Sequence, residues 1–335
     1  MRANVAERLL QHYVDNFRTL PWRSPPGAPQ PDPYRVWLSE VMLQQTTVAA
    51  VAPRFERFIR RWPTVQDLAA AADEEVLSEW AGLGYYARAR NLIACAREVA
   101  ARGSFPDTES QLRKLPGVGD YTAAAIAAIA FGQRAVVIDA NVERVAARLN
   151  AFKRPTKAEL RVAVDAITPA ERAGDFAQAM MDLGATICRP RQLLCGECPL
   201  RTDCKAFASG APEGFPAPKV RTVKPVRYGV AYWIGRDGAV WLVRRPGRGL
   251  LGGMAALPGP EWGSEAATSS AAGLATVRHV FTHFELRLTV VSGGDPNGEG
   301  WWHPIQSMSD AGLPTLYRRA VDAVLDAERE QRHAA

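Results

Sequence analysis

The sequence lacks any long apolar run. None of its segments approaches the ~18 consecutive apolar residues that a membrane-spanning helix requires. Residues 1–20 also lack the apolar centre of a secretory signal. Both absences argue against a membrane-embedded or exported protein, and we therefore expect a soluble, cytoplasmic one.

A strong excess of one charge is also missing. The 41 Lys and Arg residues stand against 35 Asp and Glu residues, which gives a net charge of +6. This value agrees with a polyanionic partner but does not establish one, because many enzymes are equally basic. The 335 residues, 47% of them hydrophobic, can bury more than one core, so two domains are expected.

Cysteine is scarce, yet four of the five cysteines lie close together in the pattern C-x6-C-x2-C-x5-C, at Cys188, Cys195, Cys198 and Cys204. Thiolates at this spacing can converge on one metal centre. A zinc site usually pairs two short C-x2-C turns and a redox dithiol needs only one. The unequal gaps, with proline after the third cysteine, therefore favour a [4Fe–4S] cluster, and buried unligated cysteines are the alternative.

The chain up to residue 208 is predicted to be all-α. Apolar residues recur at helical spacing in Ala- and Leu-rich stretches such as Thr64 to Trp80, Ala87 to Arg102 and Ala158 to Ile167. Residues 209–226 contain four prolines and several basic residues, a composition typical of a charged linker.

The second domain, residues 227–335, is predicted to be α+β. Two strand-like runs, Gly229 to Ile234 and Ala239 to Val243, flank the dipeptide Asp237-Gly238, which indicates a hairpin. Further strands are expected between Val277 and Val291, and a helix from about Leu316 to Gln331 closes the chain.

A glycine-rich turn, Leu115-Pro-Gly117-Val-Gly119, precedes the Ala-rich helical run from Asp120 to Ala130. The glycines permit a tight turn, and the following helix begins with unpaired backbone N–H groups that suit a phosphate. An ordinary interhelical turn would have the same pattern. Because the motif lies between helices, it favours a helix-hairpin-helix that grips a nucleic-acid backbone over a dinucleotide fold.

Two carboxylates stand out by their positions. Asp139 and Asn141 both precede a helical pattern, and either is a suitable N-cap. An aspartate at a helix N-terminus can also face a developing cation. Glu40 falls on a largely apolar helix face, so burial should raise its pKa and make it a general acid; a buried structural ion pair is the alternative.

These motifs together resemble one family. The cysteine pattern, L-P-G-V-G-x-Y-T-A, V-I-D-x-N-V-x-R-V, S-E-V-M-L-Q-Q-T and W-A-G-L-G-Y-Y-A-R-A-R-N occur in the order typical of helix-hairpin-helix DNA glycosylases, over about residues 5 to 205. Within them, the chain is most similar to MutY-type adenine DNA glycosylases. The resemblance implies a multidomain protein, with a helical glycosylase domain carrying an iron–sulfur loop at 188–204 and a Nudix-like domain.

The resemblance also implies an activity, namely removal of adenine opposite 8-oxoguanine or guanine in duplex DNA by base flipping and hydrolysis. Glu40 would then protonate the leaving adenine, and Asp139 would stabilise the oxocarbenium ion. Tyr121 and Asn141 would line the same pocket. The flipped adenine would be surrounded by Arg18, Leu20, Trp22, Arg23 and Gln178. The DNA would be contacted by Gln44, Leu83, Tyr85, Gly117, Gly119, Phe281, Thr282 and His283, of which the last three match the family's 8-oxoguanine reader.

Two residue types are missing where relatives have them. Endonuclease III-like enzymes carry a lysine at the position of Tyr121, and without that amine no Schiff base forms, which predicts a monofunctional enzyme. No run of glutamates follows Gly253, so the second domain should bind and not hydrolyse pyrophosphates. For His283, a structural role in a strand pair is the alternative.

Other functions stay open at this point. One is a glycosylase for another mispaired base; Glu40 argues against it, since a pyrimidine has no N7 to protonate. Another is a non-catalytic iron–sulfur protein that binds DNA or senses redox state. The expected partner is double-stranded DNA, the expected cofactor a [4Fe–4S] cluster, and the expected state a monomer associated with a bacterial nucleoid and not with a membrane.

Overall fold

The computed structural model describes residues 2–218, 223–247, 249–265, 273–293 and 295–334. Its elements divide into two compact units. The first comprises residues 1–70 and 94–220, and the second comprises residues 71–93 and 221–335. Within the described ranges, we find no helix long and apolar enough to cross a membrane.

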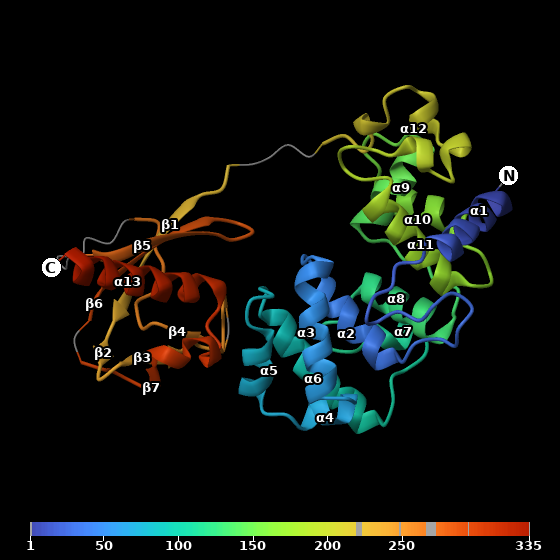
Figure 1. The fold of residues 1–335 in the computed structure, drawn as a ribbon. Coiled ribbons are helices and arrows are strands. Elements are labelled where there is room, and N and C mark those ends of the chain that lie inside the picture. The colour runs from blue at the N-terminus through green and yellow to red at the C-terminus, as the bar shows by residue number, and fades with distance from the viewer. Residues whose placement is uncertain (1, 219–222, 248, 266–272, 294, 335) are drawn as a thin grey trace. The chain divides into compact units, whose positions relative to one another are not determined.

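The first unit is helical, as predicted (Figure 1). Its helices are α1 (Arg2–Asp15), α2 (Pro33–Leu43), α3 (Val48–Arg61), α4 (Val65–Ala70), most of α6 (Ala87–Arg102), α7 (Glu109–Leu112), α8 (Asp120–Phe131), α9 (Ala140–Asn150), α10 (Lys157–Asp165), α11 (Ala173–Thr186) and α12 (Lys205–Ala208), with 3-10 turns η1 (Cys195–Glu197), η2 (Arg201–Asp203) and η3 (Pro212–Gly214).

The stretch predicted as helical from Thr64 to Trp80 is split into α4 and α5 (Asp73–Trp80). Ala72 takes an extended conformation between them and serves as the N-cap of α5. The acidic residues 73–75 follow immediately, and carboxylates favour the first turn of a helix. Apolar periodicity continues through this break, so it did not reveal where one helix ends and the next begins.

Helix α8 is buried on all sides from Thr122 to Ala130. A helix that is apolar all round belongs in the centre of a domain, and its Ala-rich sequence lets neighbours approach closely. A Cβ atom added to Gly174 on α11 would lie 2.5 Å from the backbone oxygen of Ala128. Glycine is therefore required where α11 crosses α8.

The predicted linker is partly attached to the first unit. The buried Arg148 on α9 donates hydrogen bonds to the backbone oxygens of Pro212 and Phe215. The backbone N–H of Ala217 also donates to Lys153. Proline-rich composition thus indicated a linker at residues 212–217, where side-chain and backbone contacts hold the chain in place.

The second unit contains α5, the start of α6, two sheets and a closing helix. The strands are β1 (Val226–Trp233), β2 (Gly235–Arg236), β3 (Ala239–Arg244), β4 (Ala255–Ala256), β5 (Gly273–Val280), β6 (Glu285–Ser292) and β7 (Gly300–Pro304), followed by η4 (Ile305–Asp310) and α13 (Thr315–Ala334). One sheet has the order β1-β6-β5; in the other, β3 pairs with β2, β4 and β7.

The predicted hairpin is present in a shortened form. The turn at Asp237-Gly238 has two positive φ angles and joins the two-residue strand β2 to β3. The longer run from Gly229 belongs to β1, which pairs in parallel with β6 instead. Strand propensity and the turn signal were correct, but the partner of β1 lies more than 50 residues away, since Val226 pairs with Glu285.

The two sheets of this unit and helix α13 share one apolar core. Buried residues from β3, β6 and α13, such as Leu242, Leu288 and Val321, belong to the same cluster. Helix α13 packs mainly against β5 and also contacts β6. The closing helix predicted from Leu316 to Gln331 is thereby confirmed with slightly wider bounds.

Candidate active site

A cavity of about 780 Å³ lies within the first unit. It is bordered by the loop before α2, by α2, by α8, by the start of α9 and by α11. The structure brings together here ten of the residues predicted for the site, Arg18, Leu20, Trp22, Arg23, Glu40, Gln44, Tyr121, Asp139, Asn141 and Gln178.

Glu40 is a buried carboxyl group of the cavity, with 7% of its surface exposed. Asp32 caps α2 by accepting a hydrogen bond from Tyr34, which fixes the start of the helix and its rotation. Burial raises the pKa of Glu40 to about 7; the hydrogen bond from Tyr121 and the charge of Arg23 oppose this rise, while Asp139 adds to it. A carboxyl group with this pKa exchanges its proton near neutral pH.

Tyr121 lies on the first turn of α8 and faces Glu40. Its hydroxyl donates to Oε2 of Glu40 at 2.6 Å and lies 3.5 Å from the sulfur of Met181. Burial raises the pKa of Tyr121 well above its usual value, and the nearby Glu40 and Asp139 carboxylates raise it further. The phenol is therefore a neutral hydrogen-bond donor at this site.

The side chain of Asp139 is the N-cap of α9. Its Oδ1 accepts from the backbone N–H of Val142 at 2.7 Å, and its Oδ2 accepts from Nδ2 of Asn141 at 2.8 Å. The two capping residues that the sequence left undecided thus have different roles. Asp139 caps the helix, and Asn141 orients the carboxylate of Asp139.

Arg144 connects this carboxylate to the cysteine loop. Its guanidinium donates to Oδ1 of Asn141 at 2.9 Å and to the backbone oxygens of Gly184 and Cys188 at 2.7 and 2.8 Å. Sequence reasoning missed Arg144. Its position one turn after Asn141 was the available signal, because residues three apart on a helix lie on one face.

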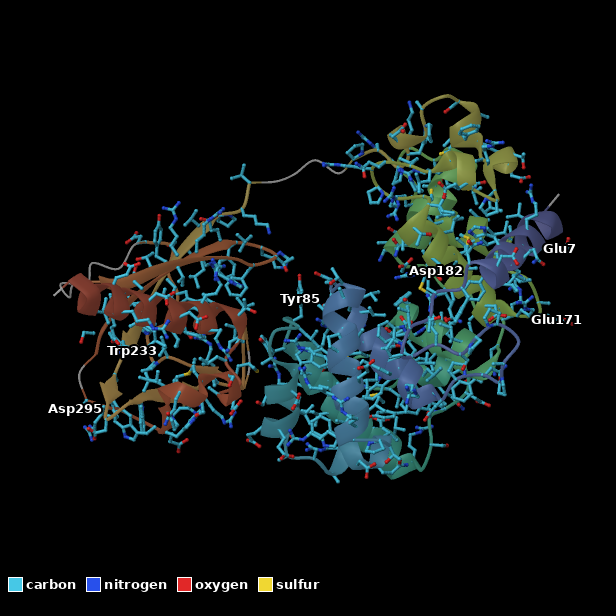
Figure 2. All side chains as sticks on the ribbon, viewed as in Figure 1. Glu7, Tyr85, Glu171, Asp182, Trp233 and Asp295 are labelled. Atoms are coloured by element: carbon cyan, nitrogen blue, oxygen red, sulfur yellow. The ribbon has the colours of Figure 1, made fainter. Side chains whose placement is uncertain are left out.

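Asp182 was missed as well. It lies on α11 in the first unit (Figure 2), and its carboxylate pairs with both Arg18 and Arg23. The predicted Gln178, one turn earlier on the same helix, borders the cavity, although its amide also lies 3.4 Å from the backbone oxygen of Gly174.

The four clustered cysteines border a small separate cavity of about 20 Å³ in the first unit. The other side chains around it are apolar except for Arg148 and Arg201, and Arg148 donates to the sulfur of Cys188 at 3.2 Å. Burial raises the pKa of the Cys198 thiol to about 11. In the described ranges, no three His, Cys, Asp or Glu side chains are arranged to hold a metal ion.

The donor set of this loop nevertheless fits an iron–sulfur cluster. All four ligand candidates are thiols, the ligand type that such clusters require. The two neighbouring guanidinium groups favour thiolates and would offset the negative charge of a ligated cluster.

The glycine turn before α8 adopts the conformation that its sequence suggests. Gly117 has a φ of +73°, and Gly119 is the N-cap of α8 without a side-chain cap. The first N–H groups of α8 therefore lack a capping side chain, as an anion-binding helix start requires.

The remaining predicted DNA contacts lie in the second unit. Leu83 is buried, whereas Tyr85 is 46% exposed and has a positive φ of 49°. Phe281 stacks on Phe284 at 4.8 Å in the turn between β5 and β6, which leaves the intervening Thr282 and His283 exposed. The hydroxyl of Tyr85 lies 3.0 Å from Oγ1 of Thr282.

Comparison with known families matches both units. The HhH-GPD superfamily of base excision DNA repair proteins matches residues 38–169, and the NUDIX domain matches residues 229–323. An adenine DNA glycosylase of Mycolicibacterium smegmatis is 38% identical over 64% of this chain and 73% of that protein. The chain belongs to the adenine DNA glycosylase family.

Other adenine DNA glycosylases are similar over different spans. That of Rattus norvegicus is 35% identical over 85% of this chain and 69% of its own length. That of Homo sapiens is 45% identical over 62% of this chain, which spans only 42% of the human protein. The family and the two-part fold predicted from the sequence are thereby confirmed.

Solved structures agree on the fold of the helical unit. A thermostable thymine-DNA glycosylase aligns with a TM-score of 0.56 and 28% identity over 62% of this chain and 97% of its own. An endonuclease III in a non-covalent DNA complex aligns with a TM-score of 0.52 and 25% identity, over 62% of this chain and 94% of its own.

Burial of Glu40 predicts a pH-dependent cost in stability. Because its pKa is about 7 in the folded protein and about 4.5 unfolded, the folded state binds the proton more tightly, and stability falls as pH rises between these values. Glu40→Gln should remove this fall. The gain in unfolding free energy of the variant over the wild type should therefore be larger at pH 8 than at pH 4.5 by about 1–3 kcal/mol. Urea unfolding of both proteins at the two pH values measures this gain.

The matched control is Glu171→Gln, at an exposed position. It should leave the difference between the two pH values as in the wild type. An equal response of the two variants would show that Glu40 titrates as an ordinary surface carboxyl group.

Proposed function

We propose that this protein removes adenine mispaired with 8-oxoguanine or guanine from duplex DNA by hydrolysing the N-glycosidic bond, and so initiates base excision repair. The observation that carries the proposal is the buried Glu40, with a pKa of about 7, hydrogen-bonded to Tyr121 in a cavity that Asp139 also borders. The curated relatives extend beyond the region that matches this chain. The proposed activity therefore rests on the residues of this chain's own site.

The first chemical step needs an acid. Adenine leaves a sugar poorly as an anion, so protonation at N7 must accompany cleavage of the bond from C1′ to N9. Glu40 retains its proton near neutral pH because it is buried, and it can give that proton up because Tyr121 then stabilises the carboxylate. The bonding electrons leave with N9, and the proton goes to N7.

The sugar left behind carries positive charge at C1′ and its ring oxygen. We assign its stabilisation to Asp139, whose two oxygens are held by Val142 and Asn141. A carboxylate with a fixed orientation interacts more strongly with a developing cation, because no reorganisation is needed in the transition state. The ionised Glu40 can then accept a proton from the attacking water, which completes hydrolysis.

Selection of the adenine is assigned to the cavity wall, with Arg18, Leu20, Trp22, Arg23 and Gln178 around the flipped base. Selection of the opposite base is assigned to the second unit, where Thr282 and His283 are exposed between the stacked rings of Phe281 and Phe284. Gln44, Leu83 and Tyr85 are assigned to the stack around that base. The neutral phenol of Tyr121 forms no Schiff base, so the enzyme is expected to leave the DNA strand intact.

A [4Fe–4S] cluster is proposed as the cofactor, held by Cys188, Cys195, Cys198 and Cys204. When bound, it would supply four iron–sulfur bonds that cross-link the loop. Arg148 holds the backbone oxygens of Cys188 and Arg189 and thereby positions the first of these cysteines.

The role of Glu40 is tested by Glu40→Gln in single-turnover excision from a duplex with adenine opposite 8-oxoguanine. The amide has a similar shape but no transferable proton, so we expect duplex binding to persist and excision to fall at least ~100-fold. Borohydride should trap little covalent adduct with the wild-type protein, because Tyr121 has no amine.

Two results would contradict this scheme. Near-normal excision by Glu40→Gln would place the acid elsewhere, and efficient trapping would show a Schiff base. Duplexes with uracil or thymine opposite guanine belong in the same experiment, since preferential release of either base would assign the chain to a different substrate.

The cofactor is tested by metal analysis of protein purified without oxygen. Four thiolate ligands should give yellow-brown protein with about four irons per chain. Stoichiometric zinc with no visible absorbance would be incompatible with the cluster. Cys95→Ser is the matched control, because this buried cysteine lies outside the loop and its removal should leave the iron content unchanged.

Recognition of the opposite base is tested in the full-length protein with Thr282→Ala and His283→Ala. Loss of one base-reading contact typically costs about 1–3 kcal/mol of discrimination, so the preference for 8-oxoguanine over guanine should fall by about 5- to 150-fold. Thr276→Ala, exposed in the middle of β5, is the control. Unchanged discrimination in both variants would leave the reading to Gln44, Leu83 and Tyr85.

A further inference from the structure

Asp182 has an arrangement that the reaction scheme above does not use. Its carboxylate is 11% exposed and pairs with two arginines of the same loop. Arg23 binds it through two contacts, Nη1 to Oδ2 at 2.5 Å and Nη2 to Oδ1 at 3.0 Å. Arg18 donates to Oδ1 at 3.0 Å.

Both arginines and Asp182 border the cavity that contains Glu40. The loop that carries the arginines runs from α1 to α2 through turns and irregular backbone, so its position depends on side-chain anchors. One anchor is the edge-to-face contact of Trp22 with Phe55 at 5.3 Å, and another is the hydrogen bond from Arg35 to the backbone of Pro21. Asp182 supplies the anchor for the charged side chains.

We propose that Asp182 is a positioning residue for excision, which holds Arg23 in the cavity wall and offsets its charge so that Glu40 keeps its proton until the adenine is bound. This inference rests on the proposed function. It goes beyond that function by assigning to α11 control over the protonation of the acid on α2.

Besides Glu40, the charged or titratable groups that border the cavity are Arg18 and Arg23 from the loop, Tyr121 from α8, Asp139 and Glu143 at the start of α9, and Asp182 from α11. Among them, the positive charge of Arg23 lowers the pKa of Glu40 and Asp139 raises it. Arg23 is only 8% exposed, so water screens its charge weakly. The bidentate contact with Asp182 therefore determines how much of this charge reaches Glu40.

Excision needs protonated Glu40, so its rate falls as pH rises through the pKa of about 7. Asp182→Asn keeps the shape of the side chain but leaves Arg23 uncompensated, which lowers the pKa of Glu40. The alkaline fall in rate should move to lower pH by about one unit, equivalent to about tenfold slower excision above the pKa.

Removal of Arg23 should act in the opposite direction. Arg23→Gln leaves the negative charge of Asp182 with only Arg18, so the alkaline fall should move to higher pH, although the rate itself drops because Arg23 borders the adenine pocket. The double variant, Asp182→Asn with Arg23→Gln, should return the fall to near its wild-type position. A residue with a merely structural role would slow excision without moving the fall.

The experiment is single-turnover excision from pH 5 to pH 9 with the wild type, these three variants and Asp175→Asn. Asp175 is the matched control, because it lies on the same helix and pairs with the exposed Arg172. It should behave as the wild type. Opposite shifts for the two single variants support the proposal, and an unshifted fall in both overturns it.

A second measurement does not depend on activity. Urea unfolding compares Glu40→Gln with its parent in the wild-type and Asp182→Asn backgrounds at pH 8. A lowered Glu40 pKa should make the gain from Glu40→Gln smaller in the Asp182→Asn background, and an equal gain in both backgrounds would overturn the inference. A wild type that releases no adenine would refute the proposed function alone, because the unfolding comparison would still test Asp182.

Discussion

The close packing of α11 against α8 and α9 is the constraint on which the cavity depends. It is possible because α11 has glycine at both crossings: a Cβ at Gly174 would lie 2.5 Å from the Ala128 oxygen, and one at Gly184 would lie 2.6 Å from Cβ of Asn141. Between these two glycines, α11 carries Gln178 and Asp182. Backbone contact thus determines the distance of these side chains from the residues of α8 and α9.

The carboxylates of the cavity are held in ion pairs and hydrogen-bonded sets. Asp182 is matched by two arginines, Asp139 by a backbone N–H and Asn141, and Glu40 by the Tyr121 hydroxyl. Isolated buried charges are strongly unfavourable, so each group needs such partners. Glu40 has a neutral donor where the other two carboxylates have either cations or a helix N-terminus, and its burial raises its pKa to about 7.

Local patterns were enough to predict part of the site. The helical period places Glu40 between Val36 and Gln44 on an apolar face, and the capping rules narrow the N-cap of α9 to Asp139 or Asn141, because both patterns depend only on residues within one or two turns. The fold class and family were equally accessible, since several motifs point to the same domain. The roles assigned to Leu83, Tyr85 and the Phe281 turn remain predictions.

Contacts between distant segments were not accessible from the sequence. Asp182 meets Arg18 and Arg23 across more than 150 residues, and nothing near Asp182 in the sequence indicates a buried cation. The same holds for β1, whose alternation predicts a strand but not its parallel partner β6. Propensity determines which element forms, whereas packing of the whole chain determines what it lies beside.

The double use of Asp139 affects how substitutions at this position would be tolerated in a cell. The side chain that faces the reacting sugar in the proposed mechanism also closes the first turn of α9. Replacing it with a residue that cannot cap removes a contact worth about 1 kcal/mol, and losses of this size can reduce the abundance of a marginally stable protein. Asparagine retains the cap, so it would leave a normally abundant protein that occupies lesions without repairing them.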